Sequence, residues 1–126
     1  RIASLIAMGA NYEADGLTDA CNEETLERYE ELLALPDTDP DKIQRLCIHN
    51  LMLEELDLSA EALRSIQAPT MLLAGEFDLI RDDQTEAMHR LISGSQKYIV
   101  PGGSHGFFVD DPKVLERLAK KFYKSL

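Results

Sequence analysis

Two titratable side chains stand where two apolar runs of the sequence end. Asp78 comes shortly after the run 69–75, and His105 shortly after the run 96–101. A carboxylate beside an imidazole holds the ring in one tautomer and stabilises its protonated form. The imidazole then acts as a general base and acid near neutral pH. The pattern predicts an acid–histidine pair able to assist a nucleophile, although each residue taken alone also suits a turn or a structural loop.

Three short apolar runs predict the strands that carry this pair. The run 69–75 is bounded by proline and glycine, which is typical of a strand buried on both faces. The run 96–101 contains Tyr-Ile-Val, and a further short run spans 4–8. Alternation with helices predicts a parallel sheet with right-handed crossovers. Neighbouring parallel strands end on the same side of a sheet, so both titratable residues should face one crevice.

Helices are predicted on either side of the last strand. One helix should run from residue 82 or 83 to about 92, before the strand 96–101. The stretch 102–109 is predicted to be a loop. Asp111 should cap the final helix and Pro112 should start it, because proline at the first helical position costs no hydrogen bond. That helix is expected to end near residue 124.

The middle of the chain predicts further helices. Asn22 is expected to cap a helix over 23–35. A second helix is predicted from Asp39 and Pro40, a cap followed by proline, to about residue 55. Ser59 should cap a third, short helix. The apolar residues expected to face inward on the first two helices are Leu26, Tyr29, Leu32, Leu33, Ile43, Leu46, Cys47, Leu51 and Leu53.

The order of these motifs resembles the C-terminal part of α/β-hydrolases. The stretch 68–80 (Ala-Pro-Thr-Met-Leu-Leu-Ala-Gly-Glu-Phe-Asp-Leu-Ile) resembles their seventh strand and acid turn. The stretch 96–108 (Gln-Lys-Tyr-Ile-Val-Pro-Gly-Gly-Ser-His-Gly-Phe-Phe) resembles their last strand and histidine loop. The opening 1–12 looks like the sixth strand, and 13–58 looks like a helical cap insertion. The resemblance implies a partial α/β-hydrolase fold, whose core of 1–12 and 59–126 holds a short three-stranded parallel sheet with flanking helices.

The resemblance also implies roles for the pair, with Asp78 as triad acid and His105 as triad base of a serine-type hydrolase. Its substrate would be a small ester, thioester or amide. The family's nucleophile lies in a G-x-S-x-G strand-to-helix turn, which these 126 residues lack and whose place falls upstream of Arg1. We therefore expect a C-terminal fragment that is inactive alone. The alternative is a noncatalytic remnant that oligomerises through its exposed first strand.

Composition narrows the class of partner. The net charge of -10 and pI of about 4.6 argue against nucleic acid and anionic membranes. A small molecule is the expected substrate, and triad hydrolysis requires no metal or organic cofactor. Cys21 and Cys47 lack metal-ligand spacing and favour reduced thiols in a cytoplasmic protein. No apolar run approaches the roughly 20 residues of a membrane span.

Several other residues suggest chemistry but fit it poorly. Ser104 adjoins His105, yet no strand-to-helix elbow presents it as a nucleophile. The acids at 37, 39 and 41 mimic a calcium loop whose required glycine is replaced by Lys42. His49 and His89 lie on predicted helices without a second ligand nearby. Four residues either line a pocket under the cap or belong to the helix core: Tyr12, Tyr29, Leu32 and Met52.

Overall fold

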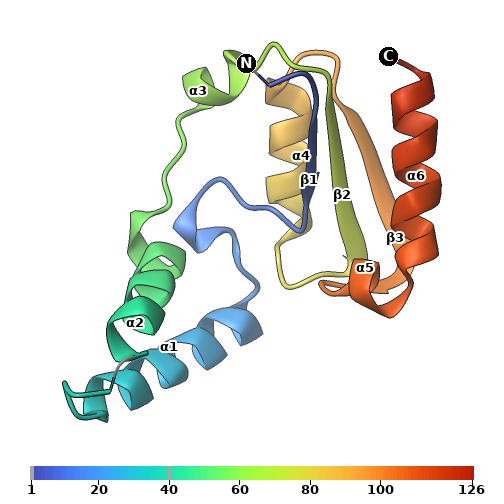
Figure 1. Cartoon of the computed structure of the whole chain (residues 1–126). Helices are drawn as coiled ribbons and strands as arrows, with labels where there is room; N and C mark the ends of the chain where they lie inside the picture. The colour runs from blue at the N-terminus through green and yellow to red at the C-terminus, as the bar shows by residue number, and fades with distance from the viewer. Residues whose placement is uncertain (1, 40) are drawn as a thin grey trace.

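The computed structural model describes residues 2–39 and 41–126. Within them, three parallel strands form one sheet in the order β1 (Leu5–Met8), β2 (Thr70–Phe77) and β3 (Gln96–Ser104). Leu5 pairs with Thr70, and Met71 pairs with Gln96. The carboxyl ends of the strands lie together at the lower edge of the sheet in Figure 1. The predicted three-stranded parallel sheet is confirmed.

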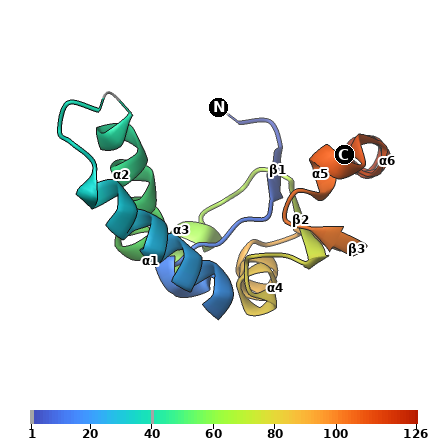
Figure 2. The ribbon, with the colours of Figure 1, turned by 90° about the horizontal axis from the view of Figure 1, so that it is seen from below.

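Two helices cover the two faces of this sheet. α4 (Asp82–Leu91) packs on one face and α6 (Pro112–Lys124) on the other, as the view along the strands in Figure 2 shows. β2 is buried on both faces, as its continuous apolar run predicts. Its alternate side chains enter two clusters, Met71 and Leu73 with Val100, Phe107 and Phe122 beside α6, and Leu72 with Leu63, Met88 and Ile92 beside α4.

The residues between β1 and β2 form a separate group of helices, here called the helical segment (residues 13–58). It extends away from the sheet at the lower left of Figure 1. An antiparallel bridge between Glu13 and Asp57 joins its two ends. The segment contains η1 (Ala14–Gly16), α1 (Asp19–Ala34), α2 (Lys42–Asn50) and the π-helical turn η2 (Leu51–Glu55), and it is followed by α3 (Ala60–Arg64).

The predicted start of α1 is wrong by one turn. Thr18, not Asn22, caps the helix, and its hydroxyl accepts a hydrogen bond from the Cys21 backbone N–H at 3.4 Å. Asn22 lies inside the helix, where its backbone N–H donates to the Thr18 carbonyl. Both residues are suitable caps, but a start at Thr18 adds one turn to the helix, and its hydroxyl satisfies one of the free N–H groups of that turn.

The predicted inward face of the second helix is wrong in part, since Leu46 and Leu53 are partly buried but other predicted residues are exposed. Ile43 is 70% exposed, and Cys47 and Leu51 are exposed as well, as are Leu26 and Leu33 of α1. The buried position near the start of α2 belongs to Lys42, whose ammonium donates to the carbonyls of Leu33 and Leu35. This lysine satisfies free carbonyls at the end of α1, which an apolar residue could not do. The prediction for Pro40 lies outside the described residues.

The C-terminal elements follow the predictions more closely. Ser59 caps α3 and Asp111 caps α6, with Pro112 at its first position. The stretch 102–109 is not a simple loop, because β3 continues to Ser104 and the short helix α5 (Phe107–Asp110) follows. Through the described part of the chain, no helix is both long and apolar enough to cross a membrane.

Candidate active site

Asp78 directly follows β2, and its carboxylate accepts three hydrogen bonds at this edge of the sheet. Its side chain is only 1% exposed. Oδ2 accepts the Gly75 backbone N–H at 3.0 Å, and Oδ1 accepts the Ile80 N–H at 3.1 Å. The carboxylate therefore closes its own turn, and we name residues 78–81 the acid turn. Two backbone hydrogen bonds fix the orientation of the group before any partner is considered.

The environment of Asp78 favours its ionised form. Burial raises the pKa of this carboxyl. The N–H groups of Gly75 and Ile80 and the ring of His105 lower the pKa, and together they outweigh burial. The net pKa lies below the ordinary aspartate value, because hydrogen bonds to the charged form offset the loss of water. Asp78 is therefore a fixed negative charge at neutral pH.

His105 directly follows β3 and completes a pair with Asp78. The distance from its Nδ1 to Oδ1 of Asp78 is 2.7 Å. Because an ionised carboxylate only accepts hydrogen bonds, Nδ1 carries the proton and Nε2 of the neutral ring is an acceptor. The His105 side chain is 42% exposed, and no described residue hydrogen-bonds to Nε2. The ring is thus held at one nitrogen and open at the other, as a general base requires.

An irregular pairing between β2 and β3 brings His105 to this position. Gly75 pairs with Val100, but Phe77 pairs with Ser104, so β3 has three residues where β2 has one. Gly102 adopts a left-handed conformation with φ of +67° and donates its N–H to the Glu76 carboxylate at 2.7 Å. A Cβ on Gly75 would lie 2.4 Å from the carbonyl oxygen of Ser104. The bulge therefore depends on a glycine in each strand.

Gly9, directly after β1, forms a third side of the site. Its φ is +50°, and a Cβ there would lie 2.7 Å from both Cε1 and Nδ1 of His105. The same Cβ would lie 3.5 Å from Oδ2 of Asp78. All three strand ends thus meet at the pair. Gly9 was missed at the sequence level, where it marked only the end of a strand, although a glycine directly after a buried strand is itself a signal of close backbone approach.

The fold that carries this pair has counterparts among solved structures. The chain matches a meta-cleavage product hydrolase from Pseudomonas fluorescens with a TM-score of 0.72 and 15% identity, over 99% of this chain and 57% of that one. It matches a thermophilic esterase from Thermogutta terrifontis with a TM-score of 0.69 and 19% identity, over 99% and 57%. It matches a hydrolase from Pseudomonas aeruginosa with a TM-score of 0.69 and 17% identity, over 98% of this chain and 56% of that one.

The chain has the fold of the C-terminal part of an α/β-hydrolase. It spans somewhat more than half the length of the solved α/β-hydrolases that it matches. At these identities the likeness concerns the fold alone. No family model matches the sequence, and no curated protein matches it.

The other residues whose types suggested chemistry form structural hydrogen bonds within this fold. The Ser104 hydroxyl donates to Asp110 at 3.0 Å and accepts the Gly106 N–H at 3.1 Å, so it stabilises the turn after β3. His89 lies 2.9 Å from the Ser95 hydroxyl, and His49 lies 2.8 Å from the Arg45 carbonyl. Across the described residues, no group of three His, Cys, Asp or Glu side chains is arranged to hold a metal ion.

The residues proposed either for a pocket or for the core fall mostly in the core. Tyr12 packs against the apolar cluster beside α4, Met52 packs against Leu17, Cys21 and Ile80, and Leu32 is buried. Tyr29 instead lines a shallow surface hollow together with Leu46, Cys47 and Asn50. These positions favour the core interpretation for three of the four residues.

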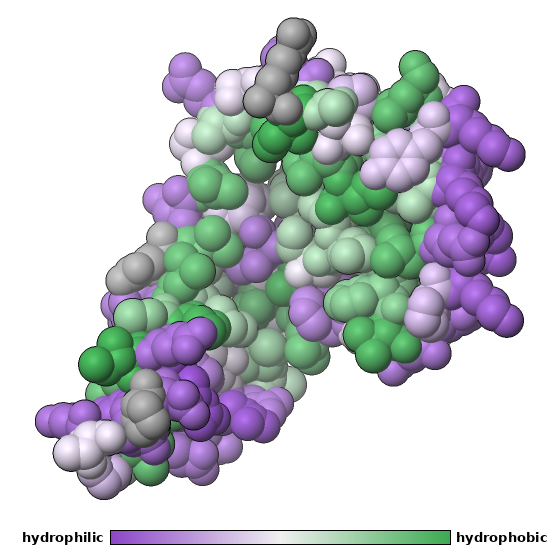
Figure 3. Space-filling view, in the orientation of Figure 1, coloured by the Kyte–Doolittle hydropathy of each residue, from purple (hydrophilic) through white to green (hydrophobic). Residues whose placement is uncertain are grey.

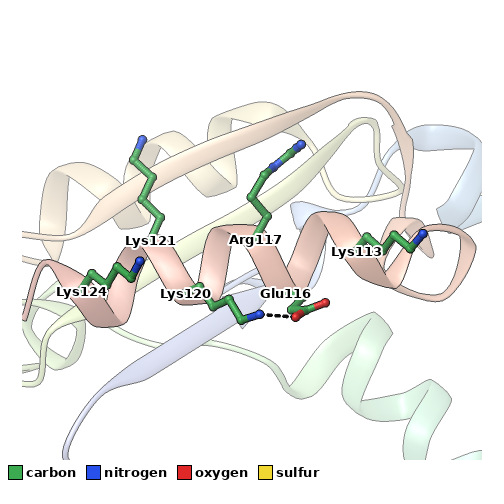
Figure 4. A pocket seen from close by; sticks show the side chains of 6 residues that line it. All are labelled: Lys113, Glu116, Arg117, Lys120, Lys121 and Lys124. Carbon is green, nitrogen blue, oxygen red and sulfur yellow. Dashed lines mark hydrogen bonds and ion pairs between the residues drawn. The ribbon is translucent and has the colours of Figure 1, made fainter.

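A shallow hollow of about 590 Å³ runs along α6 (Figure 4), and neither Asp78 nor His105 lines it. It is lined by Lys113, Glu116, Arg117, Lys120, Lys121 and Lys124. Lys120 forms an ion pair with Glu116 one turn away, and the ammonium of Lys121 lies 5.0 Å from the centre of the Tyr98 ring. These contacts are typical of a solvated helix face.

Proposed function

We propose that this chain supplies the acid and the base of a serine-type α/β-hydrolase active site, acting on a small ester, thioester or amide. The supporting observation is the buried Asp78 carboxylate, which accepts a hydrogen bond at 2.7 Å from Nδ1 of a half-exposed His105. The nucleophilic serine and the oxyanion hole would come from a segment upstream of Arg1. The α/β-hydrolase fold supports this order, since its nucleophile precedes the acid and the histidine.

The geometry fits the chemistry of acyl transfer. Nε2 of His105 would take the proton from the serine hydroxyl as it attacks the acyl carbon, and would return that proton to the leaving group. Asp78 would keep the Nδ1–H tautomer and stabilise the imidazolium that forms. Because Asp78 stays ionised and its orientation is set by Gly75 and Ile80, the ring needs no rearrangement between the two steps.

The helical segment would form the cap over this site, with the core provided by residues 1–12 and 59–126. One feature of the chain path and one hydrogen bond support this assignment. The segment leaves the sheet directly after β1, at the edge that carries the pair, and the Thr18 N–H donates to the Leu79 carbonyl of the acid turn at 2.9 Å. A cap anchored there would cover the crevice and would select the substrate by shape.

The proposal is tested with the protein that joins this chain to its upstream coding segment. Hydrolysis of p-nitrophenyl esters, thioesters and anilides of increasing acyl length should reveal one preferred class. His105→Ala should abolish turnover, whereas Ser104→Ala should leave kcat/KM within about twofold because its hydroxyl has structural partners only. Turnover that survives His105→Ala, or is lost only in Ser104→Ala, would overturn the proposal.

An association module is the second candidate, and the edge of β1 favours it. In the described residues β1 pairs on one side only, with β2. Ile6 and Met8 on this strand are only partly buried and lie on the face of the sheet that α6 covers. Apolar side chains gather over the sheet on the side seen in Figure 3. Exposed strand edges pair with other chains. Sedimentation of the 126-residue chain should then show a dimer that Ile6→Lys dissociates, whereas a cooperatively folded monomer would exclude this candidate.

A further inference from the structure

Gln84, in the first turn of α4, is a buried polar residue that the proposed mechanism does not use. It is 2% exposed, less than most apolar residues of the helix. Its backbone N–H donates to the Arg81 carbonyl at 3.1 Å, which is an ordinary turn contact. Its amide side chain instead leaves the helix and contacts residues that lie about 70 positions earlier in the chain. Burying an amide is costly unless its hydrogen bonds are satisfied, so its partners indicate its purpose.

The partners of the Gln84 side chain all lie in residues 9–18, which we name the entry segment because it runs from the end of β1 into the start of the helical segment. Oε1 accepts the Tyr12 backbone N–H at 3.2 Å, and Nε2 donates to the Glu13 carboxylate at 3.3 Å. A Cβ on Gly16 would lie 2.6 Å from Cδ of Gln84. The amide therefore holds the entry segment by two hydrogen bonds and one close backbone contact.

The entry segment in turn lies against the His105 ring and is bonded to the acid turn that carries Asp78. At one end, Gly9 lies against the His105 ring. At the other end, the Gly16 carbonyl accepts the Arg81 N–H, and the Thr18 N–H donates to the Leu79 carbonyl, each at 2.9 Å. These two bonds fasten the segment to the acid turn. The Ile80 N–H between them donates to Asp78. A shift of the entry segment would therefore move both the wall behind His105 and the turn that orients Asp78.

We propose that Gln84 is a positioning residue for the acid–histidine pair. Its two hydrogen bonds hold the middle of the entry segment against α4. Gly9 and the acid turn then keep His105 Nδ1 and Asp78 Oδ1 within hydrogen-bonding distance. Gln84 does not touch the pair itself. The inference rests on the proposed function for its meaning in catalysis, but the geometry it predicts can be measured without any hydrolysis.

The test uses the 126-residue chain labelled with ¹⁵N and long-range ¹H–¹⁵N spectra of His105, which report the tautomer and the exchange of the Nδ1 proton with water. Gln84→Leu keeps similar volume and removes both amide hydrogen bonds. We expect the Nδ1 proton to exchange about threefold to tenfold faster, the effect of one weakened hydrogen bond. Met88→Ala, in the same helix and in the apolar cluster beside α4, is the control for a general loss of stability.

Glu13→Ala provides a second variant that leaves the core intact, because Glu13 is only partly buried. It should speed the exchange in the same direction, and it should add little in the Gln84→Leu background because the two residues share one contact. Equal exchange in Gln84→Leu and in a Met88→Ala control of matched Tm would overturn the proposal, as would unchanged exchange in both Gln84→Leu and Glu13→Ala. If the exchange rates change as expected but the longer protein shows no hydrolysis, the hydrolase proposal is refuted and the positioning role of Gln84 stands.

Discussion

Comparing Gly9→Ala with Gly94→Ala separates two effects at Gly9: the close approach of its backbone to the His105 ring, and its left-handed backbone conformation. Gly9 and Gly94 both have left-handed backbones, with φ of +50° and +71°. A Cβ at position 94 meets no atom within 4 Å, whereas one at position 9 would lie 2.7 Å from the His105 ring. Gly94→Ala should therefore cost only the left-handed penalty of about 1–2 kcal/mol. Gly9→Ala carries the same penalty and an additional steric conflict.

The size of that conflict follows from the geometry. The ring would have to move by about 0.7 Å to restore an ordinary contact of 3.4 Å. Since the ring is the end of a flexible side chain, it moves rather than the backbone, and the 2.7 Å hydrogen bond to Asp78 is strained or lost. Losing a hydrogen bond to a charged group costs about 1.5–3 kcal/mol. The total for Gly9→Ala should be about 2.5–5 kcal/mol.

Urea denaturation of the two variants measures this difference, and long-range ¹H–¹⁵N spectra of His105 report whether the Nδ1 proton is still bound to Asp78. In an active parent protein, a ring displacement of about 0.7 Å should lower kcat/KM by roughly 10-fold to 10²-fold for Gly9→Ala and leave Gly94→Ala close to wild type. Equal destabilisation by the two substitutions, with unchanged His105 spectra, would refute the close approach of Gly9 to the ring.

Three further substitutions, and a fourth as a control, test the same structure. Asp78→Asn removes a carboxylate whose pKa is lower in the folded protein than in the unfolded chain. The stability that this carboxylate contributes is full above the unfolded pKa of about 3.9 and is lost as the pH falls through the folded pKa. The urea midpoints of wild type and variant should therefore converge below about pH 4, and a gap that stays constant with pH would contradict this. Phe122→Ala should cost about 3–5 kcal/mol by urea denaturation, because the ring is 1% exposed. Lys42→Met leaves carbonyls at the end of α1 unsatisfied and should cost about 1–3 kcal/mol; Arg28→Ala, which breaks only an exposed ion pair, should cost under about 0.5 kcal/mol in the same assay.

The sequence predicted the sheet and its edge well because local signals agreed there. Pro112 and the cap Asp111 defined α6, and a continuous apolar run defined β2. Asp78 and His105 were placed together from the rule that parallel strands end on one side. The bounds of α6 and β2 depend on residues that are close in sequence, so local patterns are enough to predict them.

The features that the sequence did not predict depend on contacts between separate elements of the fold. Gly9 and Gln84 matter because of residues about 70 to 100 positions away, which periodicity does not reveal. A glutamine near the start of a helix ordinarily faces water. Lys42 is buried because it caps another helix, and the apolar residues of α2 that should have faced inward are exposed. In each case a tertiary contact overrides the local pattern.

The claim that Asp78 and His105 belong to a serine hydrolase triad is tested most directly by fluorophosphonate labelling followed by peptide mass spectrometry. The samples are the 126-residue chain, the protein that joins it to its upstream coding segment, and the His105→Ala variant of that protein. We expect labelling of one serine upstream of residue 1 in the joined protein, its loss in His105→Ala, and no labelling of the 126-residue chain. Labelling of Ser104, labelling that is independent of His105, or no labelling of the joined protein would contradict the claim.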